Sequence, residues 1–503
     1  MIGELLQRRK DSNKVGIICG DTKLSYKKWH EMSTSLSDNM LKNYQGKIVG
    51  LFLPNGVSYA VSYFACLYAN KCIAPFHVGS SMDELLYTIT HCNISIIITT
   101  ERYSASIEKL VDTHSVSLTI IVINDDTEVI HISTFGDLRN KETENDGILD
   151  DVAILLHTSG TTSRPKRVML THEGLLSNVK SHCTSLGFGE DEVCLIQLPM
   201  VFGYCNTAQF LAHVYLGACI VINPNPFMIS DFYRIVEKWR ITNFTAVPSI
   251  LNLLYESNIS THDITSLRVI CFGGNPISAT RIGDLIKKFP SVCFIQTYGL
   301  TEAGPRATAV SCEHYDEQIG SVGRAIPGVE IAIVDSNGTR LPANMVGEVI
   351  IKSKGIMKGY YNCVEETKAI IRNGWLYTGD LGYLQADGLL YIVGRKKNII
   401  ITGGINVSPE EVEEVIKLCP NVLEAKVYGV KDNLLGEIIK ADIVTNSSDS
   451  DILQHIRSIC QEKLSVYKIP KEFQIVNAVN KTYNGKIKRS IKGERNYDIW
   501  KCE

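Results

Sequence analysis

The sequence lacks the features that would place it outside the globular proteins. It has no low-complexity tract and no internal repeat, and 45% hydrophobic with 21% charged residues exclude a disordered chain, a collagen-like fibre and a coiled coil. Its formal charge is −3 at pH 7, from 51 basic and 54 acidic residues. No global charge therefore draws the chain to nucleic acid or to an anionic membrane.

The cysteines form neither a redox motif nor a metal site. Fifteen are present, without a CxxC pair and without a Cys/His cluster at zinc spacing. Cys194, Cys219, Cys271 and Cys293 lie in apolar runs, so we expect buried free thiols in a reducing compartment.

Membrane and export signals are also lacking. Residues 1–14 have no apolar core of a secretory signal. The most apolar early stretch, residues 59–69, is too short to span a bilayer and contains Ser62. We therefore expect a cytoplasmic protein without a transmembrane segment.

What the chain does have is an alternation of two patterns. Residues 94–100, 118–123 and 219–222 have the composition of buried strands, and residues 231–239 place hydrophobic side chains at helical spacing. Such alternation predicts α/β layers with mainly parallel sheets. The 503 residues are enough for two or more domains.

One domain boundary can be argued from the residues themselves. A charged patch at residues 395–397 is followed by a predicted strand at 399–402 and then by Ser408-Pro409-Glu410-Glu411, which starts a helix and predicts a capping box. We expect residues 1–396 to form a large multi-layer α/β domain and residues 397–503 to form a small α+β domain.

The first segment with chemistry is HTSGTTSRPK at residues 157–166, which follows a predicted strand at 152–156. Its hydroxyls and backbone N–H groups can wrap a polyphosphate, with Gly160 allowing close approach and Lys166 adding a positive charge. It is not the P-loop, because GxxxxGK[ST] is absent. The alternative is a Ser/Thr-rich surface turn.

The second segment is QTYGLTEAG at residues 296–304, after a predicted strand at 292–295. Tyr298 offers an aromatic face for a base, and Gly299 permits a sharp turn. Thr301 and Glu302 offer oxygen ligands of the kind that Mg²⁺ takes alongside phosphate oxygens. The alternative is a tyrosine packed on a turn beside a solvated carboxylate.

Two later segments add charged groups. In residues 374–395, Asp380 can accept both ribose hydroxyls and Arg395 can add a donor, although each is also compatible with a solvated turn. In residues 484–489, Lys486 follows a glycine in a basic loop that would ordinarily be solvated surface. The C-terminal basic cluster has no aromatic platform beyond Tyr483, which argues against RNA.

In this order and spacing, the segments resemble the adenylate-forming superfamily of acyl-CoA synthetases, peptide-synthetase adenylation domains and firefly luciferase. HTSGTTSRPKRVMLTH resembles its phosphate loop, and CFGGNPIS, QTYGLTEAG, GEVIIKSKGIMKGYY, the segment that begins GWLYTGDLG, and NKTYNGKIKR resemble its later signatures. The likeness extends from about residue 23 to about residue 489, and six motifs in order are not a chance match.

The resemblance implies a role for each matching position. Its nucleotide-binding residues would be Thr158, Ser159, Gly160, Thr161, Thr162 and Lys166 at the β- and γ-phosphates, Gly273, Gly274 and Asn275 at the adenine with Tyr298 stacked on it, Thr301 at the α-phosphate, Asp380 and Arg395 at the ribose, and also Gly299 and Ile392. Glu302 and Thr158 would bind Mg²⁺. Thr301, Glu302 and Lys486 would be catalytic, with Lys486 as a mobile lysine that bridges the acyl carboxylate and the α-phosphate.

The same resemblance implies a mobile C-terminal domain with its hinge at Lys397. Three positions depart from the usual pattern. Ser163 and Arg167 stand where many members have glycine, which predicts slower motion of the loop, and Asn398 replaces the usual Asp after the hinge. Every position expected to touch ATP is of the expected type.

The implied reaction is ATP-dependent activation of a carboxylic acid to acyl-AMP with release of pyrophosphate, followed by thioester formation. Because the acid and ATP are both anions, Lys486 and Mg²⁺ must offset their repulsion. We expect CoA as the acceptor. The alternatives are a ligase that loads the phosphopantetheine of a carrier protein, and a non-catalytic nucleotide-binding homologue; nothing favours a luciferase-like oxygenase.

The acyl pocket is expected just after Leu198-Pro199, where Phe202 stands in place of the histidine of many acyl-CoA ligases. Tyr204 is a candidate hydrogen-bond donor and Cys205 a lining residue, and this segment bears no charge. An unpaired ammonium buried there costs several kcal/mol, so we expect an uncharged aliphatic or aromatic acid rather than an α-amino acid. A pocket set near Ala303 and Gly304 is the alternative.

Overall fold

A computed structural model of the chain describes residues 1–39, 41, 44, 46–124, 129–136, 147–157, 166–258, 262–275, 277–310, 318, 320–402, 405–432, 435–447, 451–481 and 487. Two compact units divide the chain. The first comprises Met1–Thr158, Arg164–Ile331 and Ile351–Tyr377, and the second comprises Ser159–Ser163, Ala332–Ile350 and Thr378–Glu503.

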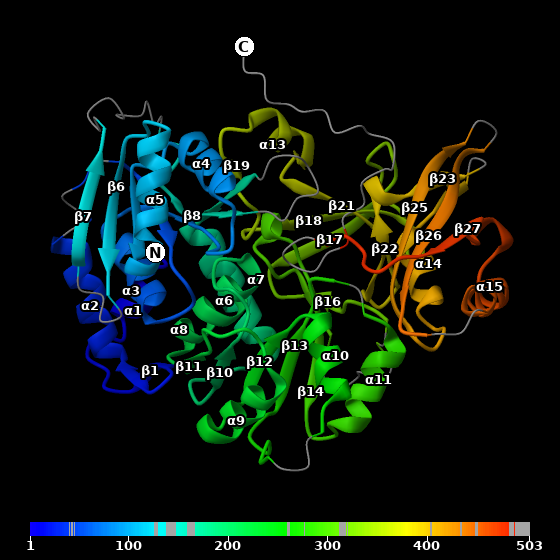
Figure 1. Cartoon of the computed structure of the whole chain (residues 1–503), viewed down its shortest axis with the longest axis horizontal. Helices are drawn as coiled ribbons and strands as arrows, with labels where there is room; N and C mark the ends of the chain where they lie inside the picture. The colour runs from blue at the N-terminus through cyan, green and yellow to red at the C-terminus, as the bar shows by residue number, and fades with distance from the viewer. Residues whose placement is uncertain are drawn as a thin grey trace. The chain divides into compact units, whose positions relative to one another are not determined.

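The first unit is built on two large sheets (Figure 1). One has the strand order β16-β15-β14-β13-β12-β10-β11-β1-β2, and its inner pairs from β14 to β1 are parallel. Its strands are β1 (Val15–Cys19), β2 (Thr22–Ser25), β10 (Val193–Ile196), β11 (Cys219–Ile222), β12 (Asn243–Ala246), β13 (Val269–Phe272), β14 (Cys293–Tyr298), β15 (Thr308–Ala309) and β16 (Arg324–Ala325).

The other large sheet has the order β19-β9-β8-β4-β3-β5-β6-β7 and is parallel from β8 to β6. Its strands are β3 (Ile48–Phe52), β4 (Cys72–Pro75), β5 (Ile96–Thr100), β6 (Leu118–Ile123), β7 (Val129–Phe135), β8 (Val152–His157), β9 (Arg167–Thr171) and β19 (Gly359–Tyr360). The buried β-branched runs of the sequence are these inner strands, which confirms the α/β prediction.

Helices cover both faces of each sheet and form layers. They are α1 (Glu4–Gln7), α2 (Tyr26–Asn39), α3 (Val57–Tyr68), α4 (Met82–His91), α5 (Glu101–Thr113), α6 (His172–Leu186), α7 (Gly203–Cys205), the π-helix η3 (Asn206–Leu211), α8 (Ala212–Leu216), α9 (Ile229–Trp239), α10 (Pro248–Glu256), α11 (Ala279–Lys288), the 3₁₀ turn η4 (Thr301–Ala303) and α13 (Val364–Ile370). One core cluster joins the two sheets through α3 and η3, and separate clusters lie under α4 and α5 and under α9, α10 and α11.

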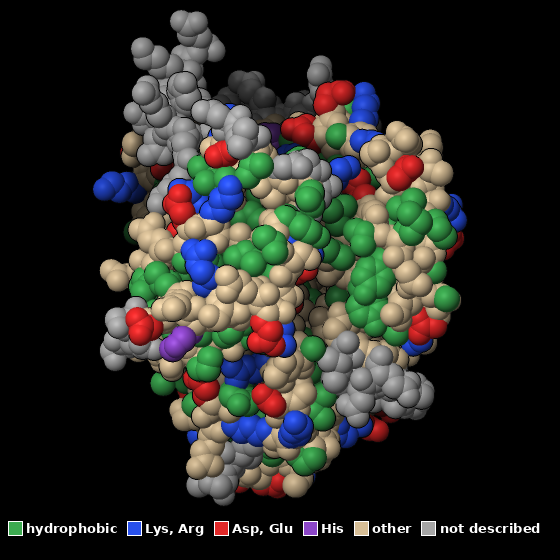
Figure 2. All heavy atoms as spheres, turned by 90° about the vertical axis from the view of Figure 1, so that its right-hand side faces the viewer, with side chains coloured by type: hydrophobic (Ala, Val, Ile, Leu, Met, Phe, Trp, Pro, Cys, Tyr) green, Lys and Arg blue, Asp and Glu red, His purple; other side chains and the backbone are tan. Residues whose placement is uncertain are grey.

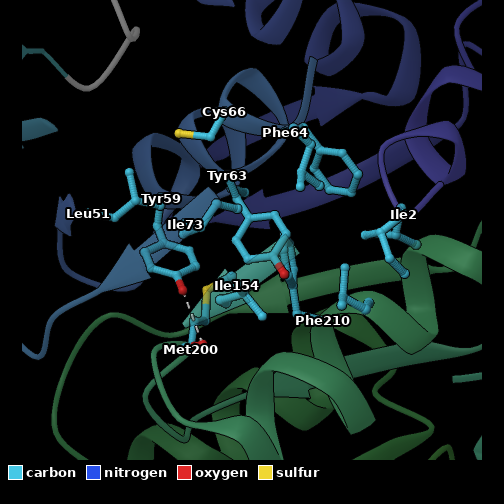
Figure 3. Packing of buried hydrophobic residues seen from close by; sticks show 14 of the residues in the cluster. Ile2, Leu51, Tyr59, Tyr63, Phe64, Cys66, Ile73, Ile154, Met200 and Phe210 are labelled. Atoms are coloured by element: carbon cyan, nitrogen blue, oxygen red, sulfur yellow. Dashed lines mark hydrogen bonds between the residues drawn. The ribbon is translucent and has the colours of Figure 1, made fainter. Parts of the chain in front are cut away.

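Aromatic packing in the central layer fixes the segment after β10. Figure 3 shows Tyr59, Tyr63 and Phe64 of α3 packed towards Phe210, with the Tyr59 hydroxyl donating to the Met200 carbonyl at 3.3 Å. The ring centroids of Tyr63 and Phe210 lie 5.3 Å apart. The apolar stretch at 59–69 is thus a core helix, and among the described residues no helix is long and apolar enough to cross a membrane.

A smaller five-stranded sheet has the order β17-β18-β21-β20, with β22 paired to β21. The C-terminal sheet has the order β24-β23-β26-β25, with β27 paired to β26, and α14 and α15 share its core. The elements are β17 (Val329–Val334), β18 (Gly347–Ser353), β20 (Ile371–Arg372), β21 (Trp375–Leu384), β22 (Leu390–Arg395), η5 (Lys396–Asn398), β23 (Ile400–Thr402), β24 (Ile405–Val407), α14 (Pro409–Ile416), β25 (Val422–Asp432), β26 (Gly436–Thr445), α15 (Ile452–Lys463), η6 (Val466–Lys468) and β27 (Glu472–Ile475).

The surface of the C-terminal sheet carries scattered rather than clustered charge. Figure 2 views the side on which β25, β26, β27 and α15 lie in Figure 1, and it shows hydrophobic side chains among basic and acidic ones. Val466 is 85% exposed and Leu423 56% exposed. The described residues of this face therefore carry no continuous basic stripe.

The helix predicted at Ser408 begins there, but the capping box is wrong. Ser408 is the N-cap and Pro409 the first helical residue, yet no side chain caps the helix. The Ser408 hydroxyl instead donates to the Val393 carbonyl of β22 at 2.8 Å, and Glu411 pairs with Lys468 at 2.6 Å. The hydroxyl is therefore oriented by a tertiary hydrogen bond instead of accepting from the Glu411 N–H as a capping box requires.

The prediction of buried free thiols holds for two of the four cysteines and in part for a third. Cys194 and Cys271 are buried free thiols and Cys219 is a half-buried one, and burial raises the pKa of Cys271 to about 11. Cys293 is disulfide-bonded, so the prediction of a free thiol there is wrong. Cys293 begins β14 shortly after exposed Ser291, at the end of the strand rather than within the apolar interior.

Candidate active site

Three of the predicted segments begin where parallel strands of the nine-stranded sheet end. The segment at 197–205 follows β10, Gly273 follows β13 and Gly299 follows β14. Because the carboxyl ends of parallel strands meet at one edge of a sheet, the three segments share that edge. A Cβ on Gly203 would lie 2.8 Å from Pro305 Cγ and 3.6 Å from Thr301 Cγ2, so the segment after β10 packs on the segment after β14.

The glycines of these segments are required by close backbone approach. A Cβ on Gly273 would lie 2.5 Å from the Thr297 carbonyl oxygen, and one on Gly299 would lie 2.2 Å from the Pro305 carbonyl oxygen. Gly304 has φ +72° and would place a Cβ 2.6 Å from the Gly355 carbonyl oxygen. Any side chain at these positions would force the segments apart.

Beside these glycines, β14 is longer than the sequence predicted. It continues through Gln296 and Thr297 to Tyr298, because Tyr298 pairs with Thr308 of β15. Tyr298 is half-buried, Asn275 is half-buried and Gly274 is exposed with φ +86°. The candidate adenine-binding residues therefore lie at the ends of two adjacent strands.

A tyrosine links the predicted metal ligand to the predicted phosphate-binding lysine. The Tyr360 hydroxyl donates to Glu302 Oε1 at 2.7 Å, and Lys166 Nζ lies 4.9 Å from the centroid of the Tyr360 ring. Tyr360 is held there because β19 pairs with β9, with Tyr360 opposite Val168. Thr158, Ser159, Gly160, Thr161 and Thr162 lie outside the described residues.

The carboxylate of Glu302 suits Mg²⁺ better than a metal that needs several protein ligands. No group of three or more His, Cys, Asp or Glu side chains in the described part of the chain has the arrangement of a metal site. Mg²⁺ is held by one or two carboxylates together with waters and phosphate oxygens. A single carboxylate at Glu302, near the lysine predicted to bind phosphate, is compatible with that requirement.

The predicted ribose residues face each other across β21 and β22. Asp380 pairs in register with Arg395, and Arg395 Nε lies 2.5 Å from Asp380 Oδ1. The Asp380 side chain is 4% exposed and that of Arg395 is 41% exposed, so the pair has a buried and an open end. Ile392 lies opposite Gly382 in the same ladder and is half-buried.

The hinge candidate Lys397 is exposed and lies in η5, a single 3₁₀ turn between β22 and β23. The next residue explains the departure noted in the sequence. Asn398 Nδ2 donates to Glu410 Oε1 at 2.8 Å, and an Asp there would place two carboxylates in contact. Lys486, Gly403 and Gly404 lie outside the described residues.

The predicted acyl-pocket residues have different surroundings. Phe202 stacks on His77 with centroids 5.8 Å apart, whereas Cys205 is fully buried in the central core. Tyr204 shares a hydrogen bond with Thr297 Oγ1 at 2.9 Å, and burial raises its pKa to about 12. Ala303 is buried beside Gly304 in η4 and its cap.

Sequence reasoning missed two residues here. Tyr360 lies inside the quoted GEVIIKSKGIMKGYY, but nothing local in that motif pointed to Glu302. Arg306 lies two positions after QTYGLTEAG, and its Cζ is 5.4 Å from the centroid of the Tyr204 ring. The segment at 198–205 itself bears no charge, but this arginine places a positive charge beside Tyr204, and a lone arginine in the apolar stretch after the motif was the available signal.

Comparison with known proteins gives the same assignment along the chain. The AMP-binding enzyme family matches residues 6–361, and the AMP-binding enzyme C-terminal domain matches residues 411–486. The chain belongs to this family. This AMP-binding enzyme is 32% identical over 463 residues to 4-coumarate-CoA ligase 1 of Narcissus pseudonarcissus, which covers 88% of this chain and 83% of the relative.

Two further relatives cover nearly the whole length. The oxalate–CoA ligase of Arabidopsis thaliana is 29% identical over 487 residues, or 94% of each chain. Among solved structures, the o-succinylbenzoate coenzyme A synthetase of Bacillus subtilis in complex with ATP and magnesium ion superposes with a TM-score of 0.84 at 26% identity, covering 96% of this chain and 98% of that chain.

The AMP-binding enzyme is an acid–thiol ligase. It activates a carboxylic acid to acyl-AMP with ATP and Mg²⁺ and then forms the CoA thioester. The predicted family, fold class, reaction and cofactors are confirmed.

Proposed function

We propose that the residues named from the sequence carry this reaction. Lys166 and the loop from Thr158 to Thr162 would bind the β- and γ-phosphates, and Thr301 the α-phosphate. Adenine would lie between the Gly273–Asn275 segment and Tyr298, next to Gly299. Asp380 and Arg395 would bind the ribose, with Ile392 beside them in the same ladder.

The observation that carries this assignment is the contact from Lys166 through Tyr360 to Glu302. Lys166 precedes Glu302 by 136 positions and Tyr360 follows it by 58. The Tyr360 hydroxyl bonds the Glu302 carboxylate at 2.7 Å, and Lys166 Nζ lies 4.9 Å from the centroid of the Tyr360 ring. The hydrogen bond from Tyr360 fixes the orientation of the carboxylate. Glu302, with Thr158, would hold Mg²⁺, which supplies positive charge beside the phosphates when bound.

Lys486 is proposed to offset the repulsion between the acid and the α-phosphate. Lys486→Ala should lower adenylate formation by about 10³-fold, since removing one preorganised charge from such a transition state costs about 10²- to 10³-fold. Thioester formation from pre-made acyl-adenylate should be largely unchanged. Pyrophosphate release and CoA consumption measure the two half-reactions separately.

The control for that variant is Lys463→Ala, because Lys463 is exposed at the end of α15 and pairs with the neighbouring Glu462. It should leave both half-reactions unchanged. Equal loss of both half-reactions in Lys486→Ala would contradict the assigned role.

We also propose that residues 397–503 form a mobile domain that turns about Lys397 between the two half-reactions. The exposed single turn between β22 and β23 supports this placement. Lys397→Pro should permit adenylation and block thioester formation, because proline fixes φ and removes the required torsional freedom. Survival of both half-reactions would place the hinge elsewhere.

The acceptor is CoA in the proposed reaction, with carrier-protein phosphopantetheine as the alternative. A direct comparison of thioester formation on CoA and on a panel of holo carrier proteins decides between them. A cytoplasmic location is proposed from the twelve free cysteines among the described residues, which suit a reducing compartment. Cell fractionation tests it.

A further inference from the structure

Arg306 is a buried cation with no carboxylate or carbonyl partner among the described residues, and its polar neighbours are the Tyr204 hydroxyl and the Cys271 thiol. Arg306 is 1% exposed. Its Nε and both terminal guanidinium nitrogens have no hydrogen-bond acceptor in the described part of the chain. The backbone of the residue is fixed, since its carbonyl accepts from Asn178 Nδ2 at 2.8 Å. The guanidinium is therefore held in place while its donors remain unused.

The described side chains on which the guanidinium acts most directly are neutral. Arg306 acts electrostatically on Tyr204, Cys271 and His182: it opposes the rise in pKa that burial imposes on the phenol and the thiol, and it adds to the fall that burial imposes on the imidazole. A neutral phenol, thiol and imidazole do not compensate a buried cation. The deficit calls for an anion.

The buried carboxylate on the same sheet is already engaged elsewhere. Glu192 also acts on Cys271, but Arg268 binds its Oε1 at 2.6 Å and Asn243 binds its Oε2 at 2.9 Å. Glu192 is therefore not the counter-ion of Arg306.

Arg306 lies between the candidate catalytic residues Thr301 and Glu302 and the candidate acyl-pocket residue Tyr204. It follows Thr301 and Glu302 by a few residues, and Pro305 packs against the position of Gly203, next to Tyr204. The Tyr204 ring lies 5.4 Å from its guanidinium carbon. At this position, Arg306 could bind a group of the acid substrate other than the carboxylate that is activated.

We propose that Arg306 binds a second carboxylate of the substrate, so that the enzyme activates dicarboxylic acids. The inference rests on the proposed position of the acyl pocket. A guanidinium presents paired N–H groups that match a carboxylate in bidentate geometry. The Tyr204 hydroxyl donates to Thr297 Oγ1, because the Thr297 hydroxyl itself donates to the Phe272 carbonyl, so the guanidinium is the group that offers donors at that end. One carboxylate reacts with ATP, and the other stays ionised throughout.

The positive charge of Arg306 also strengthens the prediction that α-amino acids are poor substrates. A substrate ammonium would meet a cation instead of merely lacking a partner. The uncharged acid expected from the segment at 198–205 is replaced by an acid with a second negative charge, because the residue that decides this lies outside that segment.

The test compares acids that differ only in the second charge. Pyrophosphate release is measured with succinic, glutaric, adipic and phthalic acids and with the monomethyl ester of each. For the best acid, kcat/KM of the free diacid should exceed that of its ester by about 10²-fold or more, as for a buried charge pair worth several kcal/mol. Arg306→Met should reduce that ratio to near one, and Arg306→Lys should keep part of it.

Arg234→Met is the matched control, since Arg234 is exposed on α9 and pairs only with Asp231 among the contacts found. It should leave the ratio unchanged. A wild-type enzyme that uses esters as well as diacids, or a preference that survives Arg306→Met, would overturn the proposal. If Arg306→Met does not fold, the wild-type ratio and Arg306→Lys still decide.

Failure of the site assignment would look different. Lys486→Ala acts on every acid alike and leaves the ratio between diacid and ester unchanged, whereas Arg306→Met changes the ratio. An unchanged rate in Lys486→Ala would refute the catalytic assignment without touching the acid preference, and the reverse pattern would refute the second carboxylate alone.

Discussion

Arg167 and Arg306 are both buried arginines of the first unit, at 3% and 1% exposure, and they differ in what surrounds their charge. One terminal nitrogen of Arg167 donates to the carbonyls of Pro75 and Leu155 at 2.8 and 3.2 Å, and its guanidinium lies 4.8 Å from the centroid of the Phe76 ring. The guanidinium of Arg306 has a ring contact with Tyr204 but, among the described residues, no carbonyl or carboxylate acceptor.

The presence or absence of acceptors indicates different roles for the two arginines: Arg167 stabilises the fold, whereas Arg306 is proposed to bind a ligand. Arg167 begins β9 and connects it to the end of β4 and to β8, so it fixes the strand that follows the predicted phosphate loop. A buried charge is stable in such a place because carbonyl oxygens solvate it. Arg306 has the same chemistry without that solvation, which is the state expected of a group whose partner arrives with the substrate.

The largest expected effect is on stability. Arg167→Met should lower the free energy of unfolding by about 3 kcal/mol, because it leaves two buried carbonyls without donors. Arg306→Met should leave it unchanged or raise it, because it removes an uncompensated charge. Urea denaturation of both variants measures the difference, with Arg234→Met as the exposed control. Equal destabilisation by both variants would make Arg306 a structural residue.

The next effect is smaller and depends on the ligand. A dicarboxylic acid at about one hundred times its Kd, in the presence of a non-hydrolysable ATP analogue, should stabilise the wild type by about 2.7 kcal/mol. Arg167→Met should show the same stabilisation from a lower starting point, whereas Arg306→Met should show little. Differential scanning fluorimetry with each diacid and its monomethyl ester measures the shifts. A full shift in Arg306→Met would contradict the comparison.

Much of the scaffold was predictable because its causes are local. The runs at 118–123 and 219–222 are β6 and β11 with the predicted bounds, since β-branched residues bury themselves in parallel sheets whatever their neighbours are. The helix that begins at Pro409 was also found from its first residues. The capping box failed because the hydroxyl of Ser408 found an acceptor on β22, which no local pattern contains.

The site was predictable only as far as motifs could carry it. The resemblance placed Glu302 and Lys166, but the tyrosine that joins them comes from a strand 58 residues after Glu302 and has no pattern of its own. Arg306 follows the motif QTYGLTEAG by two residues, but its proposed role depends on the lack of an acceptor among the described residues around it, which the sequence does not show. Contacts made and contacts missing between distant segments are properties of the fold rather than of any short stretch.

The smallest expected effect is that of pH on the preference for a second carboxylate. Burial holds the pKa of Tyr204 at about 12 and lowers that of His182 well below its ordinary value, a fall to which Arg306 adds. Tyr204 therefore stays protonated and His182 stays neutral between pH 6 and pH 10, and arginine keeps its charge throughout. The second carboxylate of a free diacid has a pKa about one unit above the value of about 4.3 for Glu, because the first carboxylate is a like charge, and it is largely ionised over the same range.

The ratio of kcat/KM for a diacid to that for its ester should thus be constant from about pH 6 to pH 10 and fall below about pH 5, where the second carboxylate gains a proton. The ratio cancels the titration of groups that act on both substrates, so it isolates the binding of the second charge. Steady-state rates at half-unit pH intervals measure it. If the ratio instead changed with a midpoint near neutral pH, a histidine and not Arg306 would bind the carboxylate. The difference between Arg306 and Arg167 would then have no role in substrate binding.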